Sequence, residues 1–257
     1  MKHSAMLLVA LASGAAASTA SADDWRHGIG TALFGLNVQG DTGFGTQLLG
    51  PVQSEIDLSS SDISDYAKSA FGLAGFSTNG TWTINYGAKG MELEDESAGT
   101  TAGGVPVTSS FNFEATGADL SAAYRFAGDD RSSWSVLGGL SYTKHDYEVG
   151  LSAGAQSTLR QVDNDWTDVV VGLIYRLGIS DNSSWTTRLD AGFGGSEGTY
   201  HLSTGVFWGL GAKQQWLLGL YGDFKAVEFE NGSPGDADWY LYDVDEFGPG
   251  FAFSYVF

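Results

Sequence analysis

The last eight residues of the chain, Gly250–Phe257 with the sequence GFAFSYVF, carry the strongest indication of its fold. Phe251, Phe253, Tyr255 and Phe257 alternate with other residues, and residues spaced by two lie on one face of a β-strand. One face of this terminal strand is therefore wholly aromatic. The pattern also fits a core strand of a soluble β-sandwich, and the rest of the chain has to distinguish the two folds.

The amino terminus has the pattern of an export signal. Basic Lys2 precedes a short apolar run, Met6–Ala12, and small residues lead to the A-x-A cleavage pattern at Ala20–Ala22. We predict that residues 1–22 are a cleaved signal peptide for the Sec route and that residues 23–257 form one mature domain. No later segment approaches the ~18 consecutive apolar residues of a membrane-spanning helix. The chain has no cysteine, which excludes disulfides, thiol catalysis and lipid attachment at a cysteine.

Composition favours a large antiparallel β-structure. The chain has 37 glycines, 8 Trp, 11 Tyr, 15 Phe and only 4 prolines. Its mean hydropathy of -0.08 suits barrel strands, which alternate apolar and polar residues. The net charge of -19 argues against nucleic acid, which is bound through basic patches.

Acidic residues cluster outside the apparent strands, at 92–96, 163–165 and 236–238. We interpret these clusters as solvated loops. The alternative is that divalent cations bridge them to anionic lipopolysaccharide, because hard cations take carboxylate oxygens. None of the clusters has the spacing of a calcium loop.

Periodicity predicts about ten strands, with eight or twelve as the alternatives. They lie near residues 25–39, 70–79, 81–93, 110–126, 133–149, 165–178, 184–194, 200–212, 216–229 and 240–257. Tight turns alternate with longer connections at 40–69, 94–109, 150–164 and 230–239, and the connection at 194–199 is a short exception. Short periplasmic turns and long outer loops are typical of outer-membrane barrels. This alternation places both termini in the periplasm.

The segment Asp57–Lys68 departs from strand alternation. Ile63, Tyr66 and Ala67 have helical spacing, and Ser and Asp residues suit a helix cap. The segment predicts either a short helix, in the first loop or folded into the lumen, or an irregular polar loop.

The position of charges within the strands separates a barrel from a sandwich. In the strand near 216–229, Trp216, Leu218 and Leu220 share one face, while Asp223 and Lys225 lie on the other. An Arg or Lys that faces the bilayer midplane costs ~2–4 kcal/mol, so such charges should face the lumen. The predicted lumen charges are Lys89, Asp119, Arg125, Asp168, Arg176, Arg188, Asp190, Asp223 and Lys225. Tryptophans begin four strands, as in interfacial girdles: Trp82, Trp134, Trp185 and Trp216.

These patterns predict an all-β fold: a single transmembrane, antiparallel, up-and-down β-barrel in the outer membrane of a Gram-negative bacterium. The expected partners are outer-membrane lipid and lipopolysaccharide. The terminal stripe resembles the signal by which the barrel-assembly machinery recognises outer-membrane barrels. Its members are Phe251, Phe253, Tyr255 and Phe257, with Ala252 where that signal usually has glycine.

Several longer motifs carry a family resemblance. They are Asp57–Phe76 leading into Gly80–Trp82, Asp165–Asp168 followed by Gly172 and Tyr175–Arg176, Arg188–Gly194, Gly219–Phe224 and Gly248–Phe251. The chain resembles a family of proteobacterial outer-membrane barrels of uncharacterised function. Ser141 and Asp223 stand where relatives tend to carry arginine. The resemblance implies a fold and a location, and it implies no catalytic residues.

A barrel of this size limits the functions open to the chain. Barrels of ~8 strands are filled by side chains, whereas open channels appear at ~16–18 strands. Opposite charges in a confined lumen should pair, because an unpaired buried charge is costly. We predict a lumen filled by paired charges, with a structural, adhesion or narrow, porin-like role and no cofactor.

The alternative is an outer-membrane enzyme that acts on lipid A or phospholipid. His201 and Ser203 are two residues apart and share a strand face, as a base and a nucleophile require. The spacing resembles the His-x-Ser of lipid A deacylases, although this face is the predicted lumen side. His145 and Asp146 are adjacent and should point to opposite faces. Because of these face assignments, we predict no catalytic residues. The histidines show no metal-ligand spacing, so we predict no metal-binding residues.

Overall fold

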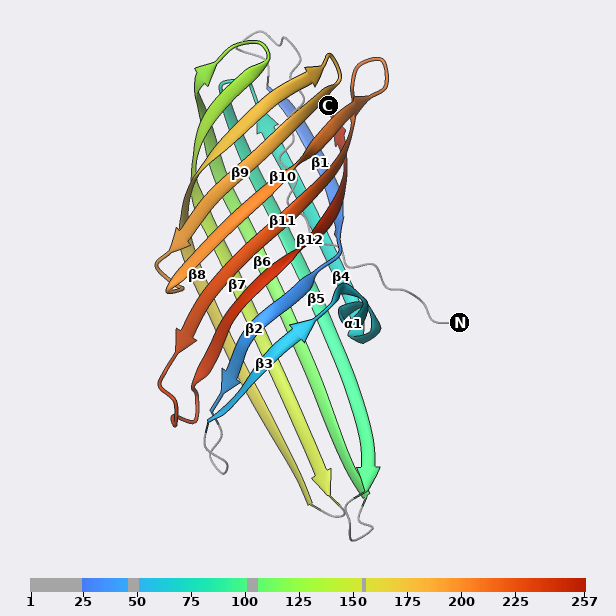
Figure 1. Cartoon of the computed structure of the whole chain (residues 1–257), viewed down its shortest axis with the longest axis vertical. Helices are drawn as coiled ribbons and strands as arrows, with labels where there is room; N and C mark the ends of the chain where they lie inside the picture. The colour runs from blue at the N-terminus through green and yellow to red at the C-terminus, as the bar shows by residue number, and fades with distance from the viewer. Residues whose placement is uncertain (1–24, 46–50, 101–105, 154–155) are drawn as a thin grey trace.

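The computed structural model describes residues 25–45, 51–100, 106–153 and 156–257, which form a tall barrel of tilted strands (Figure 1). The predicted signal peptide, 1–22, lies outside these residues. The described elements are β1 (Arg26–Phe34), β2 (Asn37–Phe44), β3 (Val52–Leu58), α1 (Ser60–Tyr66), β4 (Ala67–Thr78), β5 (Trp82–Thr100), β6 (Pro106–Gly128), β7 (Ser132–Ala153), β8 (Gln156–Ser180), β9 (Ser183–Phe193), β10 (Gly198–Leu210), β11 (Trp216–Asn231) and β12 (Tyr240–Val256).

The barrel closes between its first and last strands. β12 pairs antiparallel with β1, where Gly28 lies opposite Val256, and then with β2, where Asn37 lies opposite Phe247. β1 and β2 therefore occupy one position in the wall. β3 and β4, which pair with β2 and β1 and are joined through α1, occupy the next. Counted in this way, the described strands form a closed antiparallel barrel of ten positions, which confirms the predicted fold class.

The two ends of the barrel differ. The C-terminus and the short turns lie at the top of Figure 1, which we call the turn end. At the opposite, loop end, β5 to β8 continue far beyond the other strands. The loops predicted at 94–109 and 150–164 are therefore wrong over most of their length. In the first segment, β5 continues to Thr100 and β6 begins at Pro106. In the second, β7 continues to Ala153 and β8 begins at Gln156. These segments carry no outward apolar stripe, so the sequence pattern ends before the backbone pairing does.

The expected first loop at 40–69 contains the end of β2, the whole of β3 and helix α1. Ser59 caps α1, because its hydroxyl accepts from the Asp62 N–H at 3.4 Å and the Asp62 carboxylate accepts from the Ser59 N–H at 3.0 Å. The Ser59 hydroxyl also donates to the Asp62 carboxylate at 2.5 Å, and this bond, together with the bond from the Ser59 N–H, lowers the pKa of the Asp62 carboxyl. Ile63 is buried in the same apolar cluster as Leu93. Of the two alternatives for this segment, the structure shows the helix, at the side of the barrel. In the described part of the chain, no helix is long and apolar enough to span a membrane.

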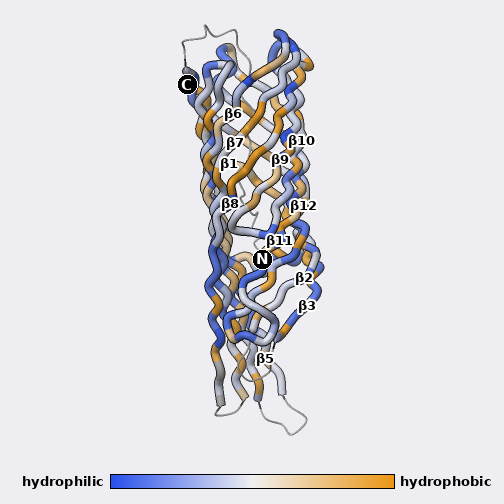
Figure 2. Tube along the Cα trace, turned by 90° about the vertical axis from the view of Figure 1, so that its left-hand side faces the viewer, coloured by the Kyte–Doolittle hydropathy of each residue, from blue (hydrophilic) through white to orange (hydrophobic). Residues whose placement is uncertain are grey.

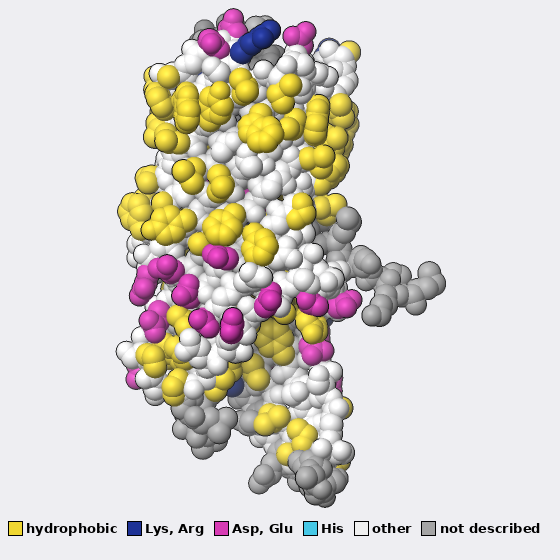
Figure 3. All heavy atoms as spheres, in the orientation of Figure 1, with side chains coloured by type: hydrophobic (Ala, Val, Ile, Leu, Met, Phe, Trp, Pro, Cys, Tyr) yellow, Lys and Arg dark blue, Asp and Glu magenta, His cyan; other side chains and the backbone are white. Residues whose placement is uncertain are grey.

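The outside of the barrel has an apolar belt. Exposed aliphatic and aromatic side chains cover the wall toward the turn end, and an acidic band lies below them (Figure 3). The trace in Figure 2 likewise shows hydrophobic stretches in the upper part and a more hydrophilic zone below. Trp82, Trp134, Trp185 and Trp216 are 39–46% exposed, as a membrane-interface girdle requires. Phe251, Phe253, Tyr255 and Phe257 are exposed on the same outer surface.

Candidate functional site

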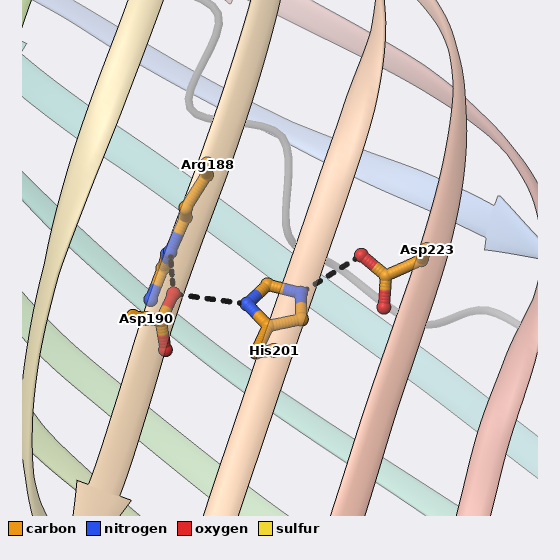
Figure 4. Close-up of polar contacts among 4 residues, drawn as sticks. All are labelled: Arg188, Asp190, His201 and Asp223. Atoms are coloured by element: carbon orange, nitrogen blue, oxygen red, sulfur yellow. Dashed lines mark hydrogen bonds and ion pairs between the residues drawn. The ribbon is translucent and has the colours of Figure 1, made fainter.

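Four charged side chains form a continuous set of contacts inside the barrel (Figure 4). Arg188 Nε lies 2.5 Å from Asp190 Oδ2, and His201 Nδ1 lies 3.1 Å from the same oxygen. His201 Nε2 lies 2.9 Å from Asp223 Oδ2. Strand register produces this arrangement, because β10 lies between β9 and β11 and places His201 directly opposite Asp190. We refer to these four residues as the His201 network.

The geometry of the His201 network bears on the enzyme alternative. Each ring nitrogen of His201 faces a carboxylate, an arrangement that suits the doubly protonated ring donating from both nitrogens. Ser203 is hydrogen-bonded to Asp223 rather than to His201. No nitrogen of His201 is left to accept a proton from Ser203, so the two residues do not form a base–nucleophile pair.

The second histidine candidate is also separated from its acid. His145 is buried inside the barrel, and its Nδ1 lies 2.9 Å from the hydroxyl of Tyr240. Asp146 lies on the other face of β7 and forms an ion pair of 2.9 Å with Lys144. This is the opposite-face arrangement expected for neighbouring strand residues.

Most of the predicted lumen charges lie around one cavity of about 380 Å³. Those lining it are Lys89, Asp119, Asp168, Arg188, Asp190, Asp223 and Lys225. The other two, Arg125 and Arg176, lie toward the turn end, where Arg125 Nη2 donates to the carbonyl oxygen of Asp129 at 2.6 Å.

Asp168 has a structural role at the edge of this cavity. Its carboxylate accepts from the backbone N–H groups of Gly195 and Ser196 at 3.0 and 2.8 Å, and from the hydroxyls of Ser196 and Thr199 at 2.7 and 2.8 Å. These bonds fold the β9–β10 connection against β8. A Cβ at Gly195 would lie 2.6 Å from the backbone of Thr167, so the close approach requires glycine. This packing holds the short connection predicted at 194–199 against the barrel wall.

Other charges at the cavity are less completely paired than the sequence predicts. Within the described residues, no oppositely charged side chain lies within 4 Å of Lys89, Lys225 or Asp119. Glu246 also lines the cavity and accepts a hydrogen bond of 3.0 Å from Tyr242. Sequence reasoning missed Glu246, although its even position, opposite the aromatic stripe of β12, is a usable signal.

Beyond the charged layer, toward the loop end, the lumen is lined by aromatic rings. The ring of His145 meets Phe113, Trp166 and Tyr242 edge-on, with centroid distances of 5.1, 5.0 and 4.6 Å. The outward neighbours of His145 on β7 are charged, which places it outside the belt. Burial lowers the pKa of His145 to about 3, so the ring is neutral at physiological pH. In the described ranges, no group of three or more His, Asp or Glu residues is arranged to hold a metal ion.

Comparisons with known proteins identify the fold alone. No protein-family model and no curated protein matches the sequence. The outer-membrane protease OmpT from Escherichia coli is similar in structure, with a TM-score of 0.54 and 8% identity over 94% of this chain and 99% of that chain. The translocator domain of the autotransporter NalP from Neisseria meningitidis matches with a TM-score of 0.45 and 10% identity over 90% of this chain and 88% of that chain. The chain thus has the fold of bacterial outer-membrane β-barrels, and its resemblance to an uncharacterised family stays a prediction.

Proposed function

We propose that this chain is an integral outer-membrane β-barrel protein whose lumen is closed to solutes and whose role is structural or adhesive. The location is supported by the tryptophan girdle, by the exposed apolar belt and by the fold shared with OmpT. The predicted signal peptide and the C-terminal aromatic stripe supply an export route and a signal for the barrel-assembly machinery. Of the roles expected from the sequence, the narrow pore is the one least supported.

The observation that carries this proposal is the His201 network. It joins three adjacent strands across the lumen-facing side of the wall, through contacts of 2.5–3.1 Å. These opposite charges are buried and paired with one another along the lumen wall, and leaving any of them unpaired would be strongly unfavourable. Toward the turn end, Phe76, Phe207, Leu217 and Val256 form a separate buried apolar cluster. A charged layer and an apolar layer thus lie one after the other along the barrel.

A role at the cell surface is supported by the part of the barrel beyond the belt. There, outward positions of β8, β11 and β12 carry exposed acids, among them Asp163, Glu228 and Asp243. Lipopolysaccharide is the expected neighbour of this band in an outer membrane, with divalent cations between the like charges. These partners belong to the proposal.

Single-channel recording of the refolded protein in planar bilayers tests the closed lumen. We expect no stable conductance steps, while an open porin refolded in the same way serves as the positive control. A large and uniform conductance from the unmodified protein would contradict the proposal.

A further inference from the structure

The lumen cavity has two chemically different ends. Toward the belt it is lined by charges, among them Lys89, Asp119 and Lys225. Toward the loop end it is lined by apolar side chains, among them Ile63, Met91, Leu93 and Phe113. A cavity of about 380 Å³ with apolar walls and a few convergent polar groups has the size and character of a small-molecule site.

The cavity reaches the surface beside α1. β5 pairs with β4 only as far as Leu93, and within the described residues neither β3 nor the remainder of β5 has a strand partner on the side that faces α1. Strand pairing is therefore interrupted between β3 and β5 at the loop end, where α1 contacts both strands. Tyr66, the last residue of α1, lines the cavity and is also 37% exposed. The cavity therefore extends to the part of the wall that α1 covers.

The charged end of the cavity has lysines and acids that do not form ion pairs with one another. Lys225 lies opposite Glu246 in the β11–β12 register, and Lys89 lies two residues along from the position opposite Asp119 in the β5–β6 register. Within the described part of the chain, neither pair closes to 4 Å. The His201 network is internally paired, and Asp168 is satisfied by the β9–β10 turn. The groups that remain for a ligand at this end are therefore two ammonium donors and two carboxylate acceptors, while the carboxylate of Asp95 lines the cavity farther along β5.

We propose that this cavity binds a small amphipathic compound that has an apolar chain and a dipolar head group without net charge. The chain lies among Ile63, Met91, Leu93 and Phe113. The head inserts between the two lysines and the two acids, where its acceptor atoms face Lys89 and Lys225 and its donor or cationic part faces Asp119 and Glu246. A head of a single charge would satisfy one pair and oppose the other, because partly buried like charges repel. The proposal does not depend on whether the lumen conducts, so this site and the closed barrel can fail separately.

The test uses the full mature chain in lipid nanodiscs, titrated calorimetrically with three probes that share an octyl chain: octylphosphocholine, octyl phosphate and octyltrimethylammonium. Empty nanodiscs supply the background for partition into lipid. We expect saturable binding of octylphosphocholine, about tenfold tighter than that of either charged probe.

Two variants on the same strand locate the site. Ala115→Trp fills the cavity, which Ala115 lines, and should weaken octylphosphocholine binding about tenfold or more. Ala118→Trp places the same ring on the exposed face of β6 and should bind as the unmodified protein does. Gel migration without heating shows that both variants fold. Equal binding by the two folded variants, tighter binding of a singly charged probe, or no binding above the background of empty nanodiscs would overturn the proposal.

Discussion

The part of the barrel beyond the belt, toward the loop end, is called the extension. The belt and the extension are built from the same strands, but apolar side chains face outward in the belt and inward in the extension. On β7, Val136 and Leu140 point outward in the belt and are 46% and 51% exposed. Farther along the same face stand Lys144, Asp146 and Glu148, while the inward positions carry the buried His145 and the partly buried Tyr147. The apolar face of one continuous strand thus changes from the outside of the barrel to the inside.

β12 shows the same reversal. Its outward residues change from Phe251 and Phe253 to Asp243 and Asp245, and its inward residues beyond the belt include the buried Tyr242 and Val244. Lipid surrounds the belt and water surrounds the extension, so apolar side chains face outward in one region and inward in the other. The extension is therefore organised as a water-soluble β-structure, and the cavity lies where the polar lumen of one region meets the apolar core of the other.

The largest expected effect compares the two regions on the outer face of β11. Leu220→Arg places a cation in the belt and should cost ~2–4 kcal/mol, which blocks assembly. Glu228→Arg places the same side chain in the extension and should assemble normally, because that position is exposed to water. The measurement is the folded, heat-modifiable fraction recovered in outer membranes. Equal recovery of the two variants would show that the boundary between belt and extension is misplaced.

Removing one member of an ion pair should also have different effects in the two regions. His201→Ala leaves Asp190 and Asp223 buried without their shared partner and should destabilise the barrel by about 3–5 kcal/mol. Lys144→Ala removes a partly exposed pair in the extension and should destabilise the barrel far less, because solvent screens that pair. Urea unfolding in lipid vesicles measures both losses. An equal or larger loss for Lys144→Ala would contradict the structural importance of the His201 network.

The sequence predicts the fold better than it predicts the site, for a physical reason. Lipid imposes a strict pattern on the belt, and therefore the terminal stripe, the tryptophan girdle and the even strand count can be recognised from the residues alone. The extension lies in water, where a polar outer face resembles a loop, and periodicity does not reveal its strands. The partners of His201 depend on strand register, which brings Asp190 and Asp223 beside it from β9 and β11, and single-strand periodicity does not encode that register.

The stability of the extension should depend on pH through His145. Its pKa is about 3 in the folded protein, below the ordinary value of 6.5. The stability that depends on the neutral ring is therefore present above pH 6.5 and is lost as the pH falls from 6.5 toward 3. Histidine-labelled NMR of the folded protein should show no protonation of His145 between pH 7 and pH 5. A titration midpoint above pH 5 would show that the aromatic cluster admits water.

The smallest expected effect concerns α1, which covers the interrupted strand pairing between β3 and β5. Ser59→Ala removes the side chain that caps the helix and should destabilise α1 locally by ~1 kcal/mol. Hydrogen exchange should become faster at the amides of α1 and stay unchanged in the belt strands. Faster exchange throughout the barrel would mean that α1 is part of the global folding unit rather than a local cover on the extension.

Nitroxide labels along the outer face of β7 test the reversal of faces most directly. Single cysteines can be introduced without interference, because the chain has no native cysteine. Labels at Val136 and Leu140 should be accessible to oxygen, which concentrates in lipid, and labels at Asp146 and Glu148 should be accessible to a water-soluble nickel complex. The account predicts that accessibility changes between Tyr142 and Asp146. Oxygen accessibility at Glu148 as high as at Leu140 would contradict it.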